Sequence, residues 1–212
     1  MAKKRGRKRR PWNKGIEVGP KDALTPNQVK RVRQTLARRG DRGLGDLTLF
    51  SLAIDTMLQG PELLGLTVKD VERSDGTIRS VIEVARPRGR PPVRCALSKA
   101  TANALGKWIA ASGKRRTDHL FSSGRAGPNH PMTVRQMNRR LKFWLAEAGL
   151  NPKKYGKESL RRTKAIYILN GTGDVEAVRM LLGHTKIEST VRYLRIAAKR
   201  TDPIVISRAF EL

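Results

Sequence analysis

The segment LLGHTKIESTVRYL, residues 181–194, combines a helical pattern with a tyrosine at the edge of the apolar face. Ile187, Val191 and Leu194 recur at the spacing i, i+4 and i+7, which is typical of an amphipathic helix. At about 100° per residue, Tyr193 falls at the border of this stripe, so its hydroxyl can face a groove. The pattern alone leaves two interpretations open: Tyr193 is a nucleophile, or it is a half-buried aromatic with a hydrated hydroxyl.

Positive charge dominates the composition of the chain. Its 212 residues include 45 lysines and arginines but 18 aspartates and glutamates, which gives a formal net charge of +27. A charge of this size predicts a polyanionic partner. No apolar run approaches the roughly 20 residues of a membrane-spanning helix, and basic residues are spread along the whole chain. The sequence therefore favours nucleic acid over a membrane as the partner.

Residues that form disulfides or bind metals are scarce. Cys95 is the single cysteine, so an internal disulfide cannot form and a reducing compartment is expected. His119 and His130 lie in loop-like segments without a metal-ligand spacing to His184. The GTGD sequence at 171–174 lacks the lysine and the strand context of a nucleotide-binding loop. We predict no metal, no cofactor and no small-molecule substrate.

Local patterns divide the chain into an arm and a folded part. The block MAKKRGRKRR begins a basic arm, residues 1–22, which is predicted to be disordered until it meets an anion. The first helix is predicted to begin at Pro26, with Thr25 as N-cap, and to end before Gly40. Further helices are predicted over 44–60, 61–66, 98–112, 133–149, 159–173, 174–184 and 187–194.

Between Lys69 and Leu97 the apolar period changes from helical to alternating. In TIRSVIEVA, Ile78, Ile82 and Val84 fall on one face, after the turn signal SDG, and RPRGRPP separates this run from VRCAL. We predict a three-stranded antiparallel sheet here, and a surface loop at SSGRAGPNHP, residues 122–131. The fold class predicted from these patterns is mainly α with one small antiparallel sheet, an α+β domain.

Three segments carry a resemblance to a known family. They occur in the order IDTMLQGPELLGLTVKDV (54–71), ESLRRTKAIYILNGTGD (158–174) and VRMLLGHTKIESTVRYL (178–194). The last has Leu182-Gly183-His184, Thr190 and Tyr193 at the family's spacing. In these segments the chain resembles the tyrosine recombinases, or phage-type integrases. The resemblance implies a catalytic domain of that type over residues 23–200, and it favours the interpretation of Tyr193 as a nucleophile.

The resemblance also implies a reaction and its residues. In this family a tyrosine oxygen attacks a DNA phosphodiester and forms a 3′-phosphotyrosyl bond, which a hydroxyl of another strand later displaces. Arginines neutralise the charge on the phosphate, and histidines assist proton movement. Carried over by position, Arg161 matches the second arginine, His184 the later histidine and Tyr193 the nucleophile. Five cations are predicted to contact DNA: Arg86, Arg88 and Arg90 of the hairpin, with Arg162 and Lys164.

Two positions depart from the family pattern. Gln59 stands where the family has its first arginine, and an amide cannot supply positive charge. Glu158 stands where the family has its first histidine, and its carboxylate is predicted to pair with Arg161 in competition with the substrate. The hairpin offers arginines but no lysine, and an arginine does not readily donate a proton at neutral pH. Lys157, Arg162 or Lys164 could reach the phosphate in place of Gln59.

Three functional classes are compatible with the sequence. The first is an enzyme of site-specific DNA breakage and rejoining that integrates or excises a mobile element, and the second is a catalytically impaired DNA-binding accessory or regulatory protein. A basic ribosomal or RNA-packaging protein would explain the charge but not the order of the motifs. We expect duplex DNA as partner, self-association on DNA, and a cytoplasmic, nucleoid-associated location in a prokaryotic or phage context. The C-terminal helix or tail, residues 201–212, contains Ile204, Val205, Ile206 and Phe210 and is predicted to dock on its own domain or on a second copy.

Overall fold

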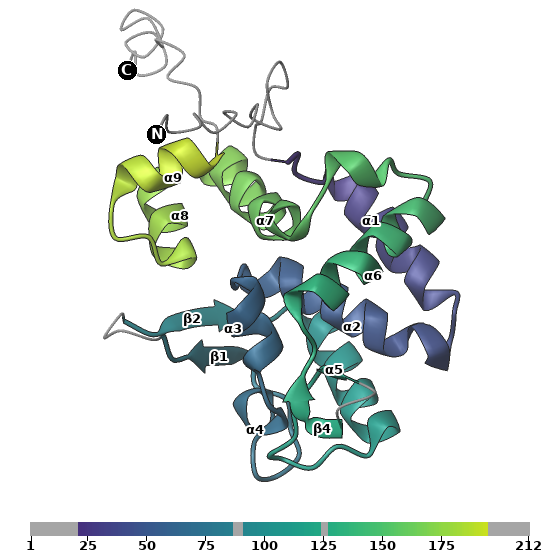
Figure 1. Ribbon diagram of the computed structural model, residues 1–212. Coiled ribbons are helices and arrows are strands. Elements are labelled where there is room, and N and C mark those ends of the chain that lie inside the picture. The colour runs from purple at the N-terminus through teal and green to yellow at the C-terminus, as the bar shows by residue number, and fades with distance from the viewer. Residues whose placement is uncertain (1–20, 87–90, 124–126, 195–212) are drawn as a thin grey trace, which may run out of the picture.

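Helices alternate with two short hairpins along the chain (Figure 1). The computed structural model describes residues 21–86, 91–123 and 127–194. The helices are α1 (Pro26–Ala37), α2 (Asp41–Thr56), α3 (Gly60–Gly65), α4 (Val68–Val71), α5 (Lys99–Ser112), α6 (Val134–Glu147), the 3₁₀ helix η1 (Pro152–Lys154), α7 (Lys157–Thr172), α8 (Val175–Leu182) and α9 (Ile187–Leu194). The strands are β1 (Val81–Val84), β2 (Val93–Ala96), β3 (Ser122–Ser123) and β4 (Gly127–Pro131). Within these ranges no helix is both long and apolar enough to cross a membrane.

The first helix begins where its capping residues predict. The Thr25 hydroxyl accepts from the amide of Gln28, the Gln28 side chain accepts from the amide of Thr25, and Pro26 occupies the first turn. This reciprocal pair satisfies two amides that the helix leaves without partners. Gly40 follows with a positive φ of 57°, a conformation that favours glycine, so the predicted end of the helix is confirmed.

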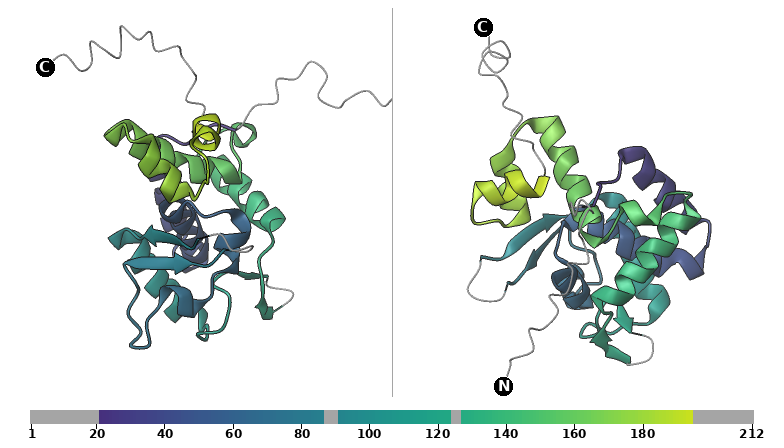
Figure 2. Two further views of the ribbon diagram at one scale, coloured as in Figure 1. Left: turned by 90° about the vertical axis from the view of Figure 1, so that its left-hand side faces the viewer. Right: turned by 45° about the horizontal axis from the view of Figure 1, so that its top comes forward.

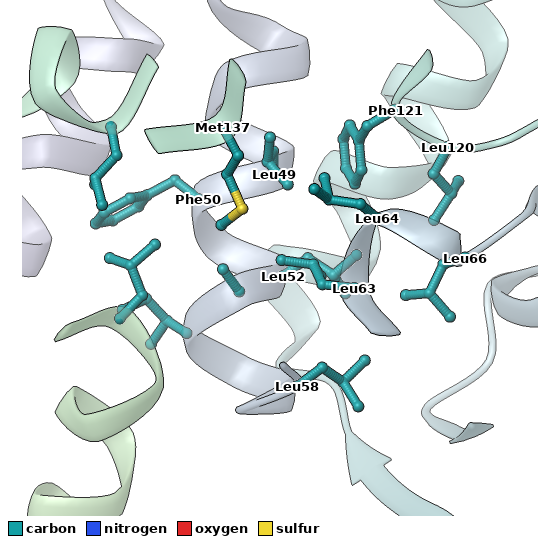
Figure 3. Packing of buried hydrophobic residues seen from close by; sticks show 14 of the residues in the cluster. Leu49, Phe50, Leu52, Leu58, Leu63, Leu64, Leu66, Leu120, Phe121 and Met137 are labelled. Carbon is teal, nitrogen blue, oxygen red and sulfur yellow. The ribbon is translucent and has the colours of Figure 1, made fainter. Parts of the chain in front are cut away.

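The main hydrophobic core surrounds α2. Every residue of this helix from Thr48 to Thr56 is buried, so α2 is a central helix, as its sequence predicts. Figure 3 shows Leu49, Phe50 and Leu52 of α2 meeting Leu63 and Leu64 of α3 and Met137 of α6. Trp144 and Leu145 of α6 are both fully buried, and the Trp144 ring packs edge-on to Phe50 with centroids 6.2 Å apart.

The predicted sheet is smaller than expected, although the mainly α class with small antiparallel sheets is confirmed. β1 and β2 form a two-stranded hairpin that pairs Val81 with Ala96 and Val84 with Val93. The predicted first strand contributes only one isolated bridge, between Glu72 and Ile78, because α4 occupies the residues just before it. The predicted surface loop at 122–131 was also wrong in part, since β3 and β4 pair there as a second hairpin.

The last three helices form a unit of their own at one end of the molecule. Both views in Figure 2 place α7, α8 and α9 together beside the β1–β2 hairpin. They enclose a second apolar cluster, whose buried members are Met57, Ala165, Val178, Leu182 and Leu194. Met57, at the end of α2, is the member contributed from outside these helices. This unit carries the segment 181–194, which contains His184 and Tyr193.

The beginning of the described chain packs on the folded part. The amide of Asp22 donates to the carbonyl of Lys154, and the Lys21 ammonium donates to the carbonyl of Lys153 at 2.8 Å. These two residues of the predicted arm therefore belong to the folded part. The remaining arm, residues 1–20, and the predicted C-terminal helix or tail, 201–212, lie outside the described residues.

Candidate active site

Arg161 lies at the centre of the site, on the first turns of α7. Its guanidinium is buried and donates from Nε to the carbonyl of Met57 at 2.7 Å and from Nη2 to the carbonyl of Leu182 at 2.6 Å. These carbonyls stand at the C-terminal ends of α2 and α8, where unpaired carbonyls and the helix dipole favour a cation. Met57 has a φ of 51°, the left-handed conformation, which is uncommon for a residue other than glycine. Arg161 thereby joins the end of α2 to the end of α8.

Two further guanidinium groups converge on the same end of α8. Arg86, just after β1, donates from Nη1 to the carbonyl of Gly183 at 2.9 Å and from Nη2 to that of Leu182 at 3.3 Å. Leu182 thus accepts from both Arg86 and Arg161. Arg179 donates from Nη1 to the carbonyl of His184. Three guanidinium groups therefore surround the turn that precedes α9, and two of them are paired with carboxylates, Arg86 with Glu62 and Arg179 with Glu176.

His184 follows this turn and is half-buried. Its Nδ1 lies 2.9 Å from the Thr190 hydroxyl, which fixes the orientation of the ring and leaves Nε2 for another partner. The pKa of His184 is lowered from its ordinary value, chiefly because burial disfavours the charged form. The guanidiniums of Arg161, Arg86 and Arg179 lower the same pKa further. His184 is consequently a neutral imidazole at physiological pH, able to accept a proton.

Tyr193 is half-buried on α9 with its hydroxyl turned toward α7. The hydroxyl donates to the backbone carbonyl of Glu158 at 3.3 Å. Its ring centre lies 5.6 Å from that of His184, 5.6 Å from the Arg161 guanidinium carbon and 4.9 Å from that of Arg162. Burial raises the pKa of Tyr193 well above its ordinary value, the Glu158 charge adds to the rise, and the two arginines oppose it. The phenol is therefore protonated in the free protein.

The two divergent positions lie at the N-terminal ends of α3 and α7. Gln59 precedes α3, where its backbone N–H donates to the Glu62 carboxylate at 2.8 Å in a capping arrangement. Glu158 starts α7 with a side chain that is 42% exposed and pairs with Lys157 at 3.6 Å. The predicted ion pair between Glu158 and Arg161 was wrong, because the carboxylate points outward while the guanidinium points into the core.

The cations predicted to contact DNA have protein partners where the structure describes them. Arg86 has a side chain that is 3% exposed, with Nε 2.9 Å from a carboxylate oxygen of Glu62 but not aligned for a hydrogen bond. Arg162 donates to the carbonyl of Lys21, and Lys164 to that of Asp55 at 2.6 Å. Arg88 and Arg90 lie outside the described residues. Contact of these five arginines and lysines with DNA stays a prediction.

Several residues of the site were not found by sequence reasoning. Glu62 and Met57 meet the site arginines through contacts far apart in the chain, and only the capping spacing of Gln59 and Glu62 gave a local signal. Thr190 was part of the recognised motif, but its hydrogen bond to His184 was not anticipated. Nowhere in 21–86, 91–123 and 127–194 do three or more His, Cys, Asp or Glu side chains gather as a metal site. Burial raises the pKa of the Cys95 thiol to about 11, which makes it a poor ligand and nucleophile.

Comparison with known proteins places this site in a family. The model of the phage integrase family matches residues 22–200, which is most of the chain. The chain belongs to the phage integrase family. Among curated relatives, the tyrosine recombinase XerD of Vibrio vulnificus (strain YJ016) is 28% identical over 185 residues, covering 87% of this integrase-family chain and 59% of the relative. XerD of Yersinia pestis is 28% identical over 175 residues, covering 74% of the chain and 52% of the relative.

Solved structures show the same fold for this integrase-family chain. The crystal structure of XerA recombinase superposes with a TM-score of 0.71 at 21% identity, covering 92% of this chain and 67% of that one. The Tn1549 transposon integrase (residues 82–397) in complex with circular intermediate DNA gives a TM-score of 0.67 at 19% identity, with coverage of 91% and 68%. The chain therefore has the tyrosine-recombinase catalytic-domain fold, and it spans 59% of the Vibrio vulnificus XerD sequence.

Proposed function

We propose that this chain binds duplex DNA and breaks and rejoins it at a specific site, with Tyr193 as nucleophile, Arg161 as phosphate ligand and His184 as proton acceptor. The observation that carries the proposal is the convergence of the three motif residues. The Tyr193 ring centre lies 5.6 Å from both the His184 ring centre and the Arg161 guanidinium. The relatives named above are recombinases and integrases, and XerH and the Tn1549 integrase are solved with DNA.

The chemistry follows from the atoms in place. The Tyr193 oxygen attacks the scissile phosphorus and forms a 3′-phosphotyrosyl bond, while the bond from phosphorus to the 5′ oxygen breaks and that oxygen leaves as a hydroxyl with a proton from solvent water. His184 Nε2 accepts the phenolic proton in the tautomer whose Nδ1 donates to Thr190, because Nε2 then carries no hydrogen, and the lowered pKa of His184 keeps the ring neutral in the free protein. Arg161 neutralises the charge that grows on the phosphate oxygens. Attack by the 5′ hydroxyl of another strand then reverses these steps and releases Tyr193.

The same proposal extends to partners and place. The net charge of +27 supports duplex DNA as substrate, because phosphate contacts release bound counterions. Strand exchange joins strands of two duplexes, so copies of the protein bound to each duplex must meet in one assembly, and we include self-association on DNA. The proposed place of action is the nucleoid of a prokaryotic cell or a phage-infected cell, in the cytoplasm.

A second candidate function is a DNA-binding accessory protein with impaired chemistry. Gln59 and Glu158 favour it, because neither supplies the cation that a pentacoordinate phosphate requires. The two candidates differ in one measurable property. A recombinase forms a covalent adduct with nicked DNA, whereas the accessory protein binds the same DNA without one.

The experiment captures covalent protein–DNA adducts from a pool of nicked duplexes of random sequence, with Tyr193→Phe as the control. Adducts formed by the unaltered chain and absent in Tyr193→Phe would support the recombinase, and sequencing the captured duplexes would reveal the site. If the unaltered chain binds without forming adducts, and Gln59→Arg with Glu158→His restores them, the accessory protein is favoured. Recovery of one donor is expected to raise adduct formation by about 10² or more.

A further inference from the structure

We propose that Arg86 supplies the second positive charge of the phosphate site and so replaces the arginine missing at position 59. The inference rests on the function proposed above and adds a catalytic residue to it. Arg86 lies 27 positions after Gln59 in the sequence, and α3, α4 and β1 lie between the two residues along the chain. Its position in the fold, rather than in a motif, is what assigns it this role.

Arg86 is joined directly to Arg161. The Leu182 carbonyl accepts from Arg86 Nη2 at 3.3 Å and from Arg161 Nη2 at 2.6 Å, so the two guanidinium groups share one acceptor. A carbonyl oxygen has two lone pairs, which allows both bonds at once. Two adjacent guanidiniums are the arrangement that a phosphodiester with two charged oxygens in its transition state requires.

The approach of Arg86 to the chain at position 183 is close. A Cβ added to Gly183 would lie 1.8 Å from Arg86 Nη1 and 2.6 Å from Cζ. The glycine therefore leaves room for the guanidinium immediately before His184. The effect of Arg86 reaches that histidine, because its charge is among the causes that lower the pKa of His184.

Arg86 also reaches the surroundings of Gln59. Both residues line one pocket of about 530 Å³, together with Glu62. The Glu62 carboxylate contacts both residues. It accepts from the backbone N–H of Gln59 at 2.8 Å and lies 2.9 Å from Arg86 Nε. Nη1 and Nη2 each keep one N–H group beyond their bonds to the Gly183 and Leu182 carbonyls, and we place the phosphate at these remaining donors.

Other nearby cations are less suited to this role. Arg162 donates to the Lys21 carbonyl and lies under the Tyr193 ring, and Lys164 donates to the Asp55 carbonyl. Lys157 pairs with Glu158 on the exposed side of α7. Arg86 alone among these four shares an acceptor with Arg161, and a guanidinium stays charged at every accessible pH.

The test measures the rate of adduct formation on nicked duplexes captured from the random pool. Arg86→Gln, which removes the charge, is expected to slow the reaction about 10²-fold. Arg94→Gln, an exposed arginine on the same hairpin, is the matched control and is expected to react as the unaltered chain does. Arg86→Lys keeps a charge and is expected to lose less than Arg86→Gln. Thermal unfolding of each variant verifies that it folds.

Moving the positive charge from position 86 to position 59 distinguishes a catalytic role of Arg86 from a role in stabilising the fold. Adding Gln59→Arg to Arg86→Gln returns a guanidinium to the phosphate but not to the Gly183 and Leu182 carbonyls, so recovery of the rate would support the proposal. A neutral methylphosphonate at the scissile position should reduce the loss caused by Arg86→Gln, whereas a structural role predicts the same loss on both substrates.

Three results would overturn the proposal. The first is an unchanged rate for Arg86→Gln, and the second is a loss in a folded Arg86→Gln that Gln59→Arg fails to recover. The third is that the unaltered chain forms no adduct but the Gln59→Arg variant does. That result would show that the recombinase chemistry is intact and that Arg86 does not replace the missing arginine. Absence of adducts from both the unaltered chain and Gln59→Arg would instead reject the recombinase function, and with it any catalytic role of Arg86.

Discussion

Replacing Gly183 with alanine should damage the site through Arg86. Gly183 ends α8 with a φ of 62°, and the left-handed conformation costs a non-glycine residue about 1 kcal/mol. The added methyl group would also occupy the place of Arg86 Nη1, 1.8 Å away, and force the guanidinium from two carbonyls. Hydrogen bonds from a charged donor contribute about 1.5–3 kcal/mol each, so the lower value for two gives about 3 kcal/mol more.

Gly173 provides the matched control. It ends α7 with a φ of 69°, but nothing lies within 4 Å of an added Cβ. Gly173→Ala is therefore expected to cost only the backbone term of about 1 kcal/mol. The additional 3 kcal/mol of Gly183→Ala corresponds to a melting temperature lower by about 6–12 °C for a domain of this size.

The assay is reversible urea or thermal denaturation of both glycine variants, each made with and without Arg86→Ala. If the guanidinium is the cause, Gly183→Ala in the Arg86→Ala background should cost no more than Gly173→Ala does. Equal costs for the two glycine variants in the otherwise unaltered chain would refute the reasoning, because the close approach of Arg86 would then contribute nothing to stability.

Three other outcomes are expected. The logarithm of DNA affinity should fall linearly with the logarithm of salt concentration, and deletion of residues 1–10 should reduce the slope by about 0.9 for each phosphate that the arm neutralises; salt-independent binding would contradict this. In an NMR titration His184 should protonate below its ordinary pKa of 6.5; because the folded-state pKa is the lower one, its contribution to stability is present above pH 6.5 and lost as pH falls through the folded value. Tyr193→Phe removes one neutral hydrogen bond, to the Glu158 carbonyl, so it should cost about 1 kcal/mol or less, keep DNA affinity and abolish adducts.

Local rules predicted the helices well because the relevant contacts are close in sequence. The cap of α1 depends on Thr25 and Gln28, three positions apart, and its apolar stripe needs only a 3.6-residue period. The predicted first strand failed for a related reason. A strand is held by a partner elsewhere in the chain, and the residues before Ile78 are taken by the turn and by α4, which leaves a single bridge to Glu72.

The site was predictable only as far as its motif extends. The spacing of His184 and Tyr193 within one segment identified both, and the structure brings their rings together. The contacts of Arg86 with the end of α8 span 96 and 97 positions, so no local pattern reports them. The sequence also could not predict that the Glu158 side chain points outward, because its direction depends on how α7 is rotated against α2.

The separate apolar cluster of α7, α8 and α9 has a consequence for motion. Tyr193 and His184 are attached through five buried apolar residues, whereas the main core contains the large side chains around α2. Segments with few buried contacts open at a lower free energy than the whole domain unfolds. Release of α8 and α9 from Met57, Arg86 and Arg161 would move Tyr193 and His184 together, while α2 and α3 stay folded. Tyr193 and His184 can thus move away from the main core as one unit, on the microsecond-to-second timescale of local opening, without unfolding of the helices around α2.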